Sequence, residues 1–260
     1  MVGDVVGGPG RDAMKALVPI LRARHKIDFV IANCENIAGG AGVTPKTAQE
    51  LLDTPGVDML TSGQHIWRHR EIGPYMDAEP RLLKPANYPK GTPGLGAYLY
   101  TAKDGTKVGV VNLAGRVFMG VTELDDPFRV GMREIEELRK KTPVVVVDMH
   151  AEATSEKVVM GWYLDGHVSA VVGTHTHIQT ADERILPKGT AYLTDLGMTG
   201  PYDSVIGREV EPVLDKFLTG MPNKYGVAKG NVKLCGAIIE VDPKTGKALA
   251  IERVQEPFGD

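Results

Sequence analysis

PVVVVDMH, residues 143–150, is the stretch that decides the fold class, because an almost wholly apolar run ends there in a carboxylate and an imidazole. Strands of this kind are expected where a sheet is covered on both faces. Four further runs of similar character lie at 27–33, 57–62, 107–113 and 167–175. Helix-like segments alternate with these runs. We therefore predict an α/β fold in which helices cover the sheets.

The helical segments are expected between these strands. Their ranges are 11–25, 44–54, 128–141, 155–165 and 208–219. The second is the best marked, because Thr44 suits an N-cap and Pro45 suits the first helical position. Two hairpins, one turning at Asp104-Gly105 and one within 237–254, predict mixed sheets and not a purely parallel barrel.

The length and composition predict one globular domain spanning residues 1–260. A chain of this length can bury a sizeable core, and its 42% hydrophobic and 24% charged residues exclude a disordered chain. The net charge is -3 and no dense basic run occurs, so the footprint for binding a long nucleic acid is missing. With two cysteines, Cys34 and Cys235, and no secretory or membrane-spanning pattern, we expect a reduced, cytoplasmic protein without membrane contact.

His175 and His177 stand two residues apart at the end of the 167–175 run. Side chains alternate along an extended segment, so the two rings are expected to point the same way, about 6–7 Å apart. Two imidazoles so placed could bind one metal ion or two neighbouring ions. The alternative is one histidine in the core and one in solvent.

Four other strand ends carry polar side chains of related types. They are Asp4, the pair Glu35 and Asn36, the pair Gln64 and His65, and His150. Imidazole, carboxylate and amide oxygen together suit Mn²⁺, Fe or Zn²⁺, and without a Cys-x-x-Cys motif a structural zinc clip is unsupported. Loops that follow the strands of an open α/β sheet gather at one edge, so these residues are expected to meet there.

The number of candidate ligands indicates two metal ions and not one. Two ions ~3.5–4 Å apart, bridged by Glu35, would use all of the ligands and could hold a hydroxide for in-line attack on phosphorus. This arrangement predicts a phosphoester hydrolase. His65 is then expected to protonate the leaving oxygen, because an imidazole titrates near neutrality. Its alternative role is that of a surface histidine that orients the following helix.

Arg11 and Arg116 are candidates for binding the substrate. A guanidinium group suits contact with phosphate oxygens, since its donors form a planar fork. Either side chain could equally form a surface ion pair. A small phosphodiester is the partner that this set of residues predicts, and the surface neither demands nor excludes a homo-oligomer.

Several motifs carry a resemblance that covers nearly the whole chain. They are GDVVGGPGR (3–11), CENIAGGAG (34–42), GQHIW (63–67), KPANYP (84–89), VVNLAGR (110–116), DMHAEATSEK (148–157) and the long block at 161–204. In these motifs the chain resembles the YmdB-type metallophosphoesterases, a branch of the calcineurin-like phosphoesterase superfamily. The resemblance implies a four-layer α/β/β/α sandwich of two mixed sheets flanked by helices. It also implies a dinuclear iron or manganese site and phosphodiesterase activity on 2′,3′-cyclic nucleotides.

The resemblance also implies roles for particular residues. The positions that match metal ligands of the family are Asp4, Glu35, Asn36, His150, His175 and His177. His65 matches the histidine that donates a proton. The superfamily pattern has a histidine two residues after the first aspartate, where this chain has Val6.

Two departures from the family pattern bear on activity. Gln64 stands where the family motif Gly-Asn-His has its asparagine, and one extra methylene displaces the ligand oxygen by about 1.5 Å. The alternative to an active enzyme is therefore a catalytically weakened, metal-binding regulatory protein. In addition, only Met1 and Val2 precede Gly3-Asp4, so a short first strand is expected to hold Asp4 less firmly.

A third interpretation is a mononuclear zinc amidohydrolase that uses His150, His175 and His177. That chemistry favours a β/α barrel, and the two expected hairpins argue against eight regular repeats. The metal content per chain would separate the interpretations, because the amidohydrolase predicts one ion and the phosphodiesterase predicts two.

Overall fold

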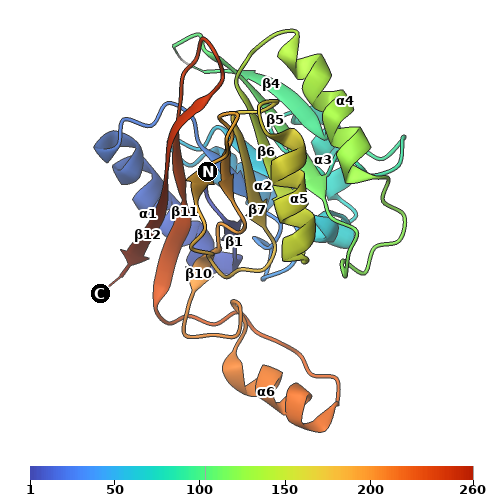
Figure 1. Ribbon diagram of the computed structural model, residues 1–260. Helices are drawn as coiled ribbons and strands as arrows, with labels where there is room; N and C mark the ends of the chain where they lie inside the picture. The colour runs from blue at the N-terminus through green and yellow to red at the C-terminus, as the bar shows by residue number, and fades with distance from the viewer. Residues whose placement is uncertain (103, 260) are drawn as a thin grey trace.

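The computed structural model describes residues 1–102 and 104–259 and shows a mixed α/β molecule (Figure 1). The helices are α1 (Gly7–Arg24), α2 (Pro45–Leu52), α3 (Ile72–Ala78), α4 (Pro127–Arg139), α5 (Thr154–Leu164) and α6 (Val210–Thr219), with a short 3₁₀ helix η1 (Gln64–Arg68). The strands are β1 (Asp4–Val5), β2 (Ile31–Asn33), β3 (Met59–Thr61), β4 (Ala97–Thr101), β5 (Lys107–Ala114), β6 (Val145–His150), β7 (Ala170–Thr174), β8 (Arg184–Ile185), β9 (Ala191–Leu193), β10 (Met198–Pro201), β11 (Val232–Val241) and β12 (Ala248–Phe258).

The strands form two main sheets of mixed direction. One has six strands in the order β4-β5-β6-β7-β9-β8, of which β5, β6, β7 and β9 run parallel and the two edge strands run antiparallel to their neighbours. The other has the order β1-β10-β11-β12, with β1 parallel to β10. The parallel pair β2-β3 lies beside β1, because Val2 forms bridges with Ala32 of β2 and with Gly236 of β11.

Alternation along β6 explains its unbroken apolar run. Val146 packs with Ile31 of β2 and Met59 of β3, in the core cluster that joins the two sheets. Val147, its neighbour, packs instead with Ile135 of α4 and Met160 of α5. Both faces of β6 are therefore covered, and each buried valine contributes about 1.5–3 kcal/mol by leaving water.

A further core cluster lies between the N-terminal helices and the neighbouring strands. Met14 of α1 and Leu51 of α2 pack there against Val5 of β1 and Leu60 of β3. Pro45 occupies the first turn of α2, and the Thr44 side chain accepts a hydrogen bond from the Thr47 amide, as the sequence predicts for this helix start.

Each predicted helix and strand is present with somewhat different bounds. The largest differences are at the first helix and at the strand predicted at 27–33. The helix begins at Gly7 and not at residue 11, because the glycine-rich segment forms its first turn, and the strand begins only at Ile31. Both hairpins form, as β4-β5 and as β11-β12. Five elements were not predicted from the sequence, because they are short and carry little periodicity: α3, η1, β8, β9 and β10.

β1 has only two residues, as expected from its sequence, yet Asp4 has definite neighbours. Its amide donates to the Gly197 carbonyl, and Asp4 lies opposite Met198 of β10. None of the helices that the structure describes has both the length and the hydropathy needed to cross a membrane.

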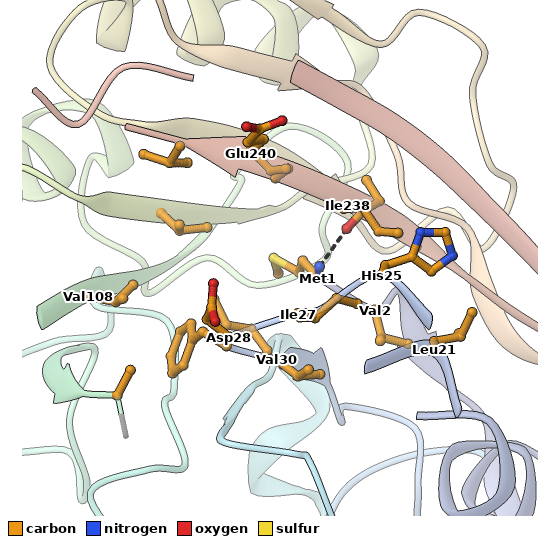
Figure 2. Close-up of a pocket in the computed structure, with 18 of the residues that line it drawn as sticks. Met1, Val2, Leu21, His25, Ile27, Asp28, Val30, Val108, Ile238 and Glu240 are labelled. Carbon is orange, nitrogen blue, oxygen red and sulfur yellow. Dashed lines mark hydrogen bonds between the residues drawn. The ribbon is translucent and has the colours of Figure 1, made fainter. Parts of the chain in front are cut away.

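A cavity of about 540 Å³ lies beside Met1, near the amino ends of β2 and β5 (Figure 2). Val2, Ile27, Val30 and Ile238 are among the apolar residues that line it, and the Met1 amino group donates to the Ala237 carbonyl oxygen at 2.6 Å. None of the predicted site residues lines this cavity, so the candidate chemistry must be sought at the other end of the sheets.

Candidate metal centre

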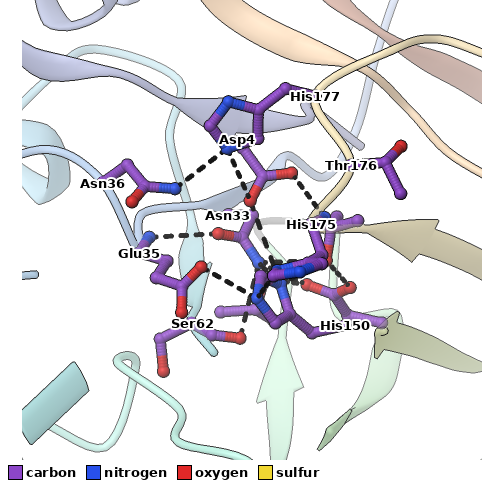
Figure 3. Close-up of polar contacts among 12 residues, drawn as sticks. Asp4, Asn33, Glu35, Asn36, Ser62, His150, His175, Thr176 and His177 are labelled. Carbon is purple, nitrogen blue, oxygen red and sulfur yellow. Dashed lines mark hydrogen bonds and ion pairs between the residues drawn. The ribbon is translucent and has the colours of Figure 1, made fainter. Parts of the chain in front are cut away.

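Side chains from five strand ends meet at one edge of the sheets (Figure 3). Asp4 lies on β1, Glu35 and Asn36 follow β2, Gln64 and His65 open η1 after β3, His150 ends β6, and His175 and His177 follow β7. The structure thus brings together the eight residues that were predicted from the sequence as ligands or proton donor. Parallel strands place their carboxyl ends at a common edge, which is why residues so distant in the chain converge.

Glu35 and His150 form the buried centre of this cluster. Glu35 Oε2 lies 2.8 Å from His150 Nε2, and Glu35 Oε1 accepts a hydrogen bond of 2.7 Å from the His65 amide. His150 Nε2 is also 3.2 Å from His175 Nδ1. Glu35, His150 and His175 each offer one ligand atom within 4.8 Å of the others, a spacing that a single ion could bridge.

Burial and the attraction between Glu35 and His150 determine the protonation states of these two side chains. Burial raises the pKa of Glu35, but the charge and hydrogen bond of His150 outweigh that effect and lower the pKa to about 2. Burial lowers the pKa of His150, but Glu35 outweighs it and raises the pKa to about 9. Without a metal, the His150 proton therefore holds the position that a cation would take.

Asp4 presents one oxygen to the cluster without a partner. Its Oδ2 accepts a hydrogen bond of 2.9 Å from the His175 amide, whereas its Oδ1 is buried with no hydrogen bond among the described residues. Oδ1 lies 3.9 Å from both His150 Nδ1 and His177 Nε2. Burial raises the pKa of Asp4 to about 6, despite the opposing effect of the two histidines. A buried, unpartnered carboxylate oxygen of this kind fits a cation.

Thr174 fixes the tautomer of His150. The Thr174 hydroxyl donates to Asp148 Oδ1 at 2.7 Å, so its oxygen is left to accept the proton of His150 Nδ1, which lies 2.9 Å away. His150 Nε2 is then the nitrogen that faces the cluster.

Polar partners of the ring nitrogens also orient His175 and His177. His177 Nδ1 donates to the Ile206 carbonyl oxygen at 2.9 Å, which leaves Nε2 to face Asn36 Nδ2 at 3.1 Å. His175 Nε2 lies 3.0 Å from Glu152 Oε2, which leaves Nδ1 to face the cluster. Each ring thus directs one lone pair inward, as metal-binding histidines do.

The backbone of the two histidines differs from the extended segment expected from the sequence. β7 ends at Thr174, and φ is 102° at His175 and 67° at His177. The prediction of alternating side chains on a strand is therefore wrong here. Both rings still reach the cluster, because a tight turn in the left-handed region brings them there at a cost of about 1–3 kcal/mol per residue.

Gly63 and Gln64 complete the space around the cluster. A Cβ on Gly63 would lie 2.2 Å from His150 Nε2 and 2.5 Å from Glu35 Oε1, so a side chain there would fill the space between the ligands. Gln64 Nε2 is 3.4 Å from His175 Nδ1, and Gln64 Oε1 is buried without a partner among the described residues. The longer side chain therefore leaves an amide oxygen available, and the donor set as a whole fits metal ions.

His65 lies at the rim of the cluster. Its Nδ1 is 3.6 Å from Glu35 Oε1 and its side chain is 42% exposed, so solvent and substrate can reach the ring. Burial lowers the pKa of His65, with opposition from Glu35 and further lowering by His150 and two arginines.

The structure does not bring Arg11 or Arg116 into contact with the candidate ligands in any hydrogen bond or ion pair of the described residues. Arg11 Nε pairs with Glu50 Oε2 at 3.0 Å, and the same guanidinium donates to the Ile37 carbonyl. Arg116 is exposed, and its amide donates to Glu156 Oε1 at 2.9 Å. Substrate contact by either arginine stays a prediction.

A buried ion pair was not predicted from the sequence. It lies next to the turn formed by His175, Thr176 and His177, called the histidine turn below. Lys157 Nζ lies 2.7 Å from Asp195 Oδ2, and the two side chains are 1% and 0% exposed. The available signal was a lysine at helical spacing from Met160, Gly161 and Leu164, the other buried positions of that stripe of α5, because lysine is almost never fully buried without a partner.

Comparisons with known proteins match nearly the whole length of the chain. The family model described as "YmdB-like protein" matches residues 1–254. The chain is 50% identical to the 2′,3′-cyclic-nucleotide 2′-phosphodiesterase of Bacillus subtilis (strain 168) over 253 residues, which covers 97% of this chain and 94% of that protein.

Two crystal structures resemble this structure over nearly all of its length. One is a hypothetical protein from Thermus thermophilus, with TM-score 0.90, 42% identity and coverage of 98% and 97%. The other is a novel phosphatase from Mycoplasma pneumoniae, with TM-score 0.91, 33% identity and coverage of 98% and 92%.

Proposed function

The chain belongs to the YmdB-like family, and we propose that it is a metal-dependent phosphodiesterase that hydrolyses small phosphodiesters, above all 2′,3′-cyclic nucleotides. The observation that carries the proposal is the convergence of Glu35, His150 and His175 within 4.8 Å beside the unpartnered Asp4 Oδ1. The relative that shares half of its residues with this chain is named as a 2′,3′-cyclic-nucleotide 2′-phosphodiesterase, which supports the substrate class.

The donor set supports two metal ions, of which iron or manganese suits the mixture of imidazole, carboxylate and amide oxygen, with zinc as a further option. His150, His175 and the Gln64 oxygen would hold one ion. Asp4, Asn36 and His177 would hold the other. Glu35, whose Oε2 lies 2.8 Å from His150 Nε2, would be a ligand common to both groups. When bound, the metal ions supply Lewis acidity and an activated water for attack on phosphorus.

The remaining steps belong to side chains of the chain itself. Attack on phosphorus must expel an alkoxide of the ribose, which needs a proton to leave. We infer that His65 donates it, a role supported by the exposed position of its ring at the rim and by the hydrogen bond from its amide to Glu35 Oε1. His150, His175 and His177 keep their inward tautomers through Thr174, Glu152 and Ile206.

A catalytically weakened regulatory protein is the less favoured alternative. That interpretation rests on Gln64 being too long to act as a ligand. The burial of Gln64 Oε1 without a partner among the described residues supports a side chain that offers its oxygen to the cluster. The name of the 50% identical relative also supports catalysis.

We propose in addition that residues 1–260 form a single domain with the four-layer α/β/β/α arrangement, in the cytoplasm. Three core clusters support the layers, namely α1 and α2 against β1–β3, one sheet against the other, and α4 and α5 against the six-stranded sheet. The contact of Asp4 with a residue 171 positions away supports one domain.

Hydrolysis of 2′,3′-cyclic AMP and of bis-p-nitrophenyl phosphate by the manganese-loaded protein tests the proposal. The expected result is metal-dependent turnover that His65→Ala lowers and that His25→Ala, a change remote from the cluster, leaves intact. A protein that is fully loaded with metal and turns over no phosphodiester would overturn the proposal.

A further inference from the structure

The buried pair Lys157 and Asp195 lies next to the turn that carries two candidate ligands. Lys157 belongs to α5, and Asp195 lies between β9 and β10. Their atoms Nζ and Oδ2 are 2.7 Å apart, and neither side chain is more than 1% exposed. Nothing in the proposed chemistry uses either residue, so the pair needs an explanation of its own.

Asp195 accepts a hydrogen bond from the centre of the histidine turn, residues 175–177. The same Oδ2 that binds Lys157 accepts a hydrogen bond of 3.1 Å from the amide of Thr176, the residue between His175 and His177. Its Oδ1 accepts a hydrogen bond of 2.8 Å from the Gly197 amide. The carboxylate therefore ties the turn to the segment that leads into β10.

The histidine turn needs such hydrogen bonds because its backbone is strained. His175 and His177 both have φ in the left-handed region, which surrounding contacts must enforce in a residue with a side chain. Asp4 Oδ2 holds the amide of His175, and Asp195 Oδ2 holds the next amide, that of Thr176. Two neighbouring amides of the turn are thus fixed by two buried carboxylates.

Lys157 is packed closely enough to fix Asp195 in turn. A Cβ on Gly173 would lie 2.9 Å from Lys157 Cδ, so the stem of the lysine passes directly against the last part of β7. The lysine charge also compensates Asp195, whose negative charge otherwise acts on Asp4. An unpaired Asp195 would add a second uncompensated carboxylate beside the metal ligands.

A gain in folding stability is a weak explanation for the buried ion pair of Lys157 and Asp195. Desolvation of both charges offsets much of the attraction inside a buried salt bridge, and well-packed apolar side chains often do as well or better. A role in geometry is the better account. We propose that Asp195 is a positioning residue for the metal centre, which holds the His175–His177 turn in its ligating conformation through the Thr176 amide, with Lys157 as the partner that compensates its charge. This inference rests on the proposed metal site but not on the identity of the substrate.

Two double variants separate the hydrogen bond from the charge. Lys157→Met with Asp195→Asn removes both charges and keeps a carbonyl oxygen that can accept from the Thr176 amide. Lys157→Met with Asp195→Leu also removes both charges but lacks that acceptor. Arg22→Met is the control, because Arg22 Nη1 and Asp58 Oδ2 form an ion pair of the same length, 2.7 Å, and the other described partners of Arg22, the Gly56 and Asp28 carbonyl oxygens, are not candidate ligands.

The readouts are Mn²⁺ affinity by calorimetry and hydrogen exchange of the Thr176 amide in the metal-free protein. We expect the Leu variant to bind Mn²⁺ about 10–100-fold more weakly and to exchange the Thr176 amide faster, in line with other losses of groups that orient ligands. Arg22→Met should stay close to wild type in both readouts. The Asn variant should lie between wild type and the Leu variant, because its single oxygen can replace only one of the two that accept from the Thr176 and Gly197 amides. At saturating Mn²⁺, kcat of the Leu variant should recover, because the loss lies in assembling the site.

Equal Mn²⁺ affinity and equal Thr176 exchange in the Leu and Asn variants would overturn the inference. If the Leu variant does not fold, as judged by thermal unfolding, Asp195→Ala with Lys157→Met makes the same comparison with a smaller side chain. Since neither readout uses a phosphodiester, the result stands even if the protein hydrolyses none of the substrates tested. The failure of this inference and the failure of the proposed activity are therefore distinguishable.

Discussion

Glu35 Oε2 and His150 Nε2 lie 2.8 Å apart, with both side chains at most 1% exposed. This contact shifts the pKa of the carboxyl to about 2 and that of the imidazole to about 9. In the metal-free protein the pair is thus an ion pair at neutral pH, in the place where the proposed metal would sit. The contact predicts how metal binding depends on pH.

Metal binding at pH 7 should release a proton from His150. Its pKa of about 9 lies above the usual 6.5, so the proton is bound at pH 7 and must leave before Nε2 can bind an ion. Mn²⁺ affinity should therefore rise about tenfold per pH unit between pH 7 and 9 and level off above. Calorimetry in buffers of different ionisation enthalpy counts the proton. Binding without proton release at pH 7 would contradict this account.

Gly63→Ala should abolish metal binding. The added Cβ would lie 2.2 Å from His150 Nε2, a position that must stay free for an ion between the ligands. Gly8→Ala is the control, because a Cβ there has no neighbour within 4 Å. We expect more than about a 100-fold loss of Mn²⁺ affinity for the first variant, on the order of the loss of a ligand or its support, and little change for the second. Elemental analysis of the purified variants, with circular dichroism to verify folding, provides the measurement.

Gln64→Met should lower the number of bound ions from two to one per chain. The change keeps the length of the side chain but removes Oε1, the buried oxygen that lacks a partner among the described residues. Gln64→Asn should not raise kcat, because Gln64 Oε1 is already buried without a partner among the described residues and is available to a cation. Titration with Mn²⁺ and steady-state kinetics test both variants. A clear rise in kcat for Gln64→Asn would support the weakened regulatory protein instead.

His65→Ala should affect substrates according to their leaving groups. Loss of a proton donor costs about 10²–10⁴ in rate when the leaving group is a poor one, such as the ribose alkoxide of 2′,3′-cyclic AMP. Bis-p-nitrophenyl phosphate expels a stable phenolate and should be affected much less. Metal content should stay at the wild-type level, since His65 is not among the proposed ligands. Equal losses on both substrates would exclude His65 as the proton donor.

Much of the fold could be predicted from the sequence because its signals are local. The run at 143–150 has valines on both faces of β6, and this pattern alone indicates a strand covered on two sides. Thr44 and Pro45 mark the start of α2 through contacts within one turn. Short elements such as α3 escaped prediction because seven residues hold too little periodicity.

The conformation of the histidine turn could not be predicted in this way. An extended continuation of β7 was expected, but the tertiary contacts of His175 and Thr176 with two buried carboxylates enforce positive φ instead. The ion pair of Lys157 with Asp195 could likewise not be predicted, because the two residues are 38 positions apart in the chain.

The sequence by itself determined which segments become covered strands and which polar residue types stand at their ends, because those properties follow from periodicities of about two and 3.6 residues. Only the tertiary structure decided that Asp4 Oδ1 has no hydrogen bond among the described residues, that Gly63 leaves room beside Glu35 and His150, and that a buried ion pair adjoins the turn. These features depend on groups up to 171 residues apart coming within hydrogen-bonding distance. Such contacts arise from packing the two sheets together, for which no local pattern in the chain gives a signal.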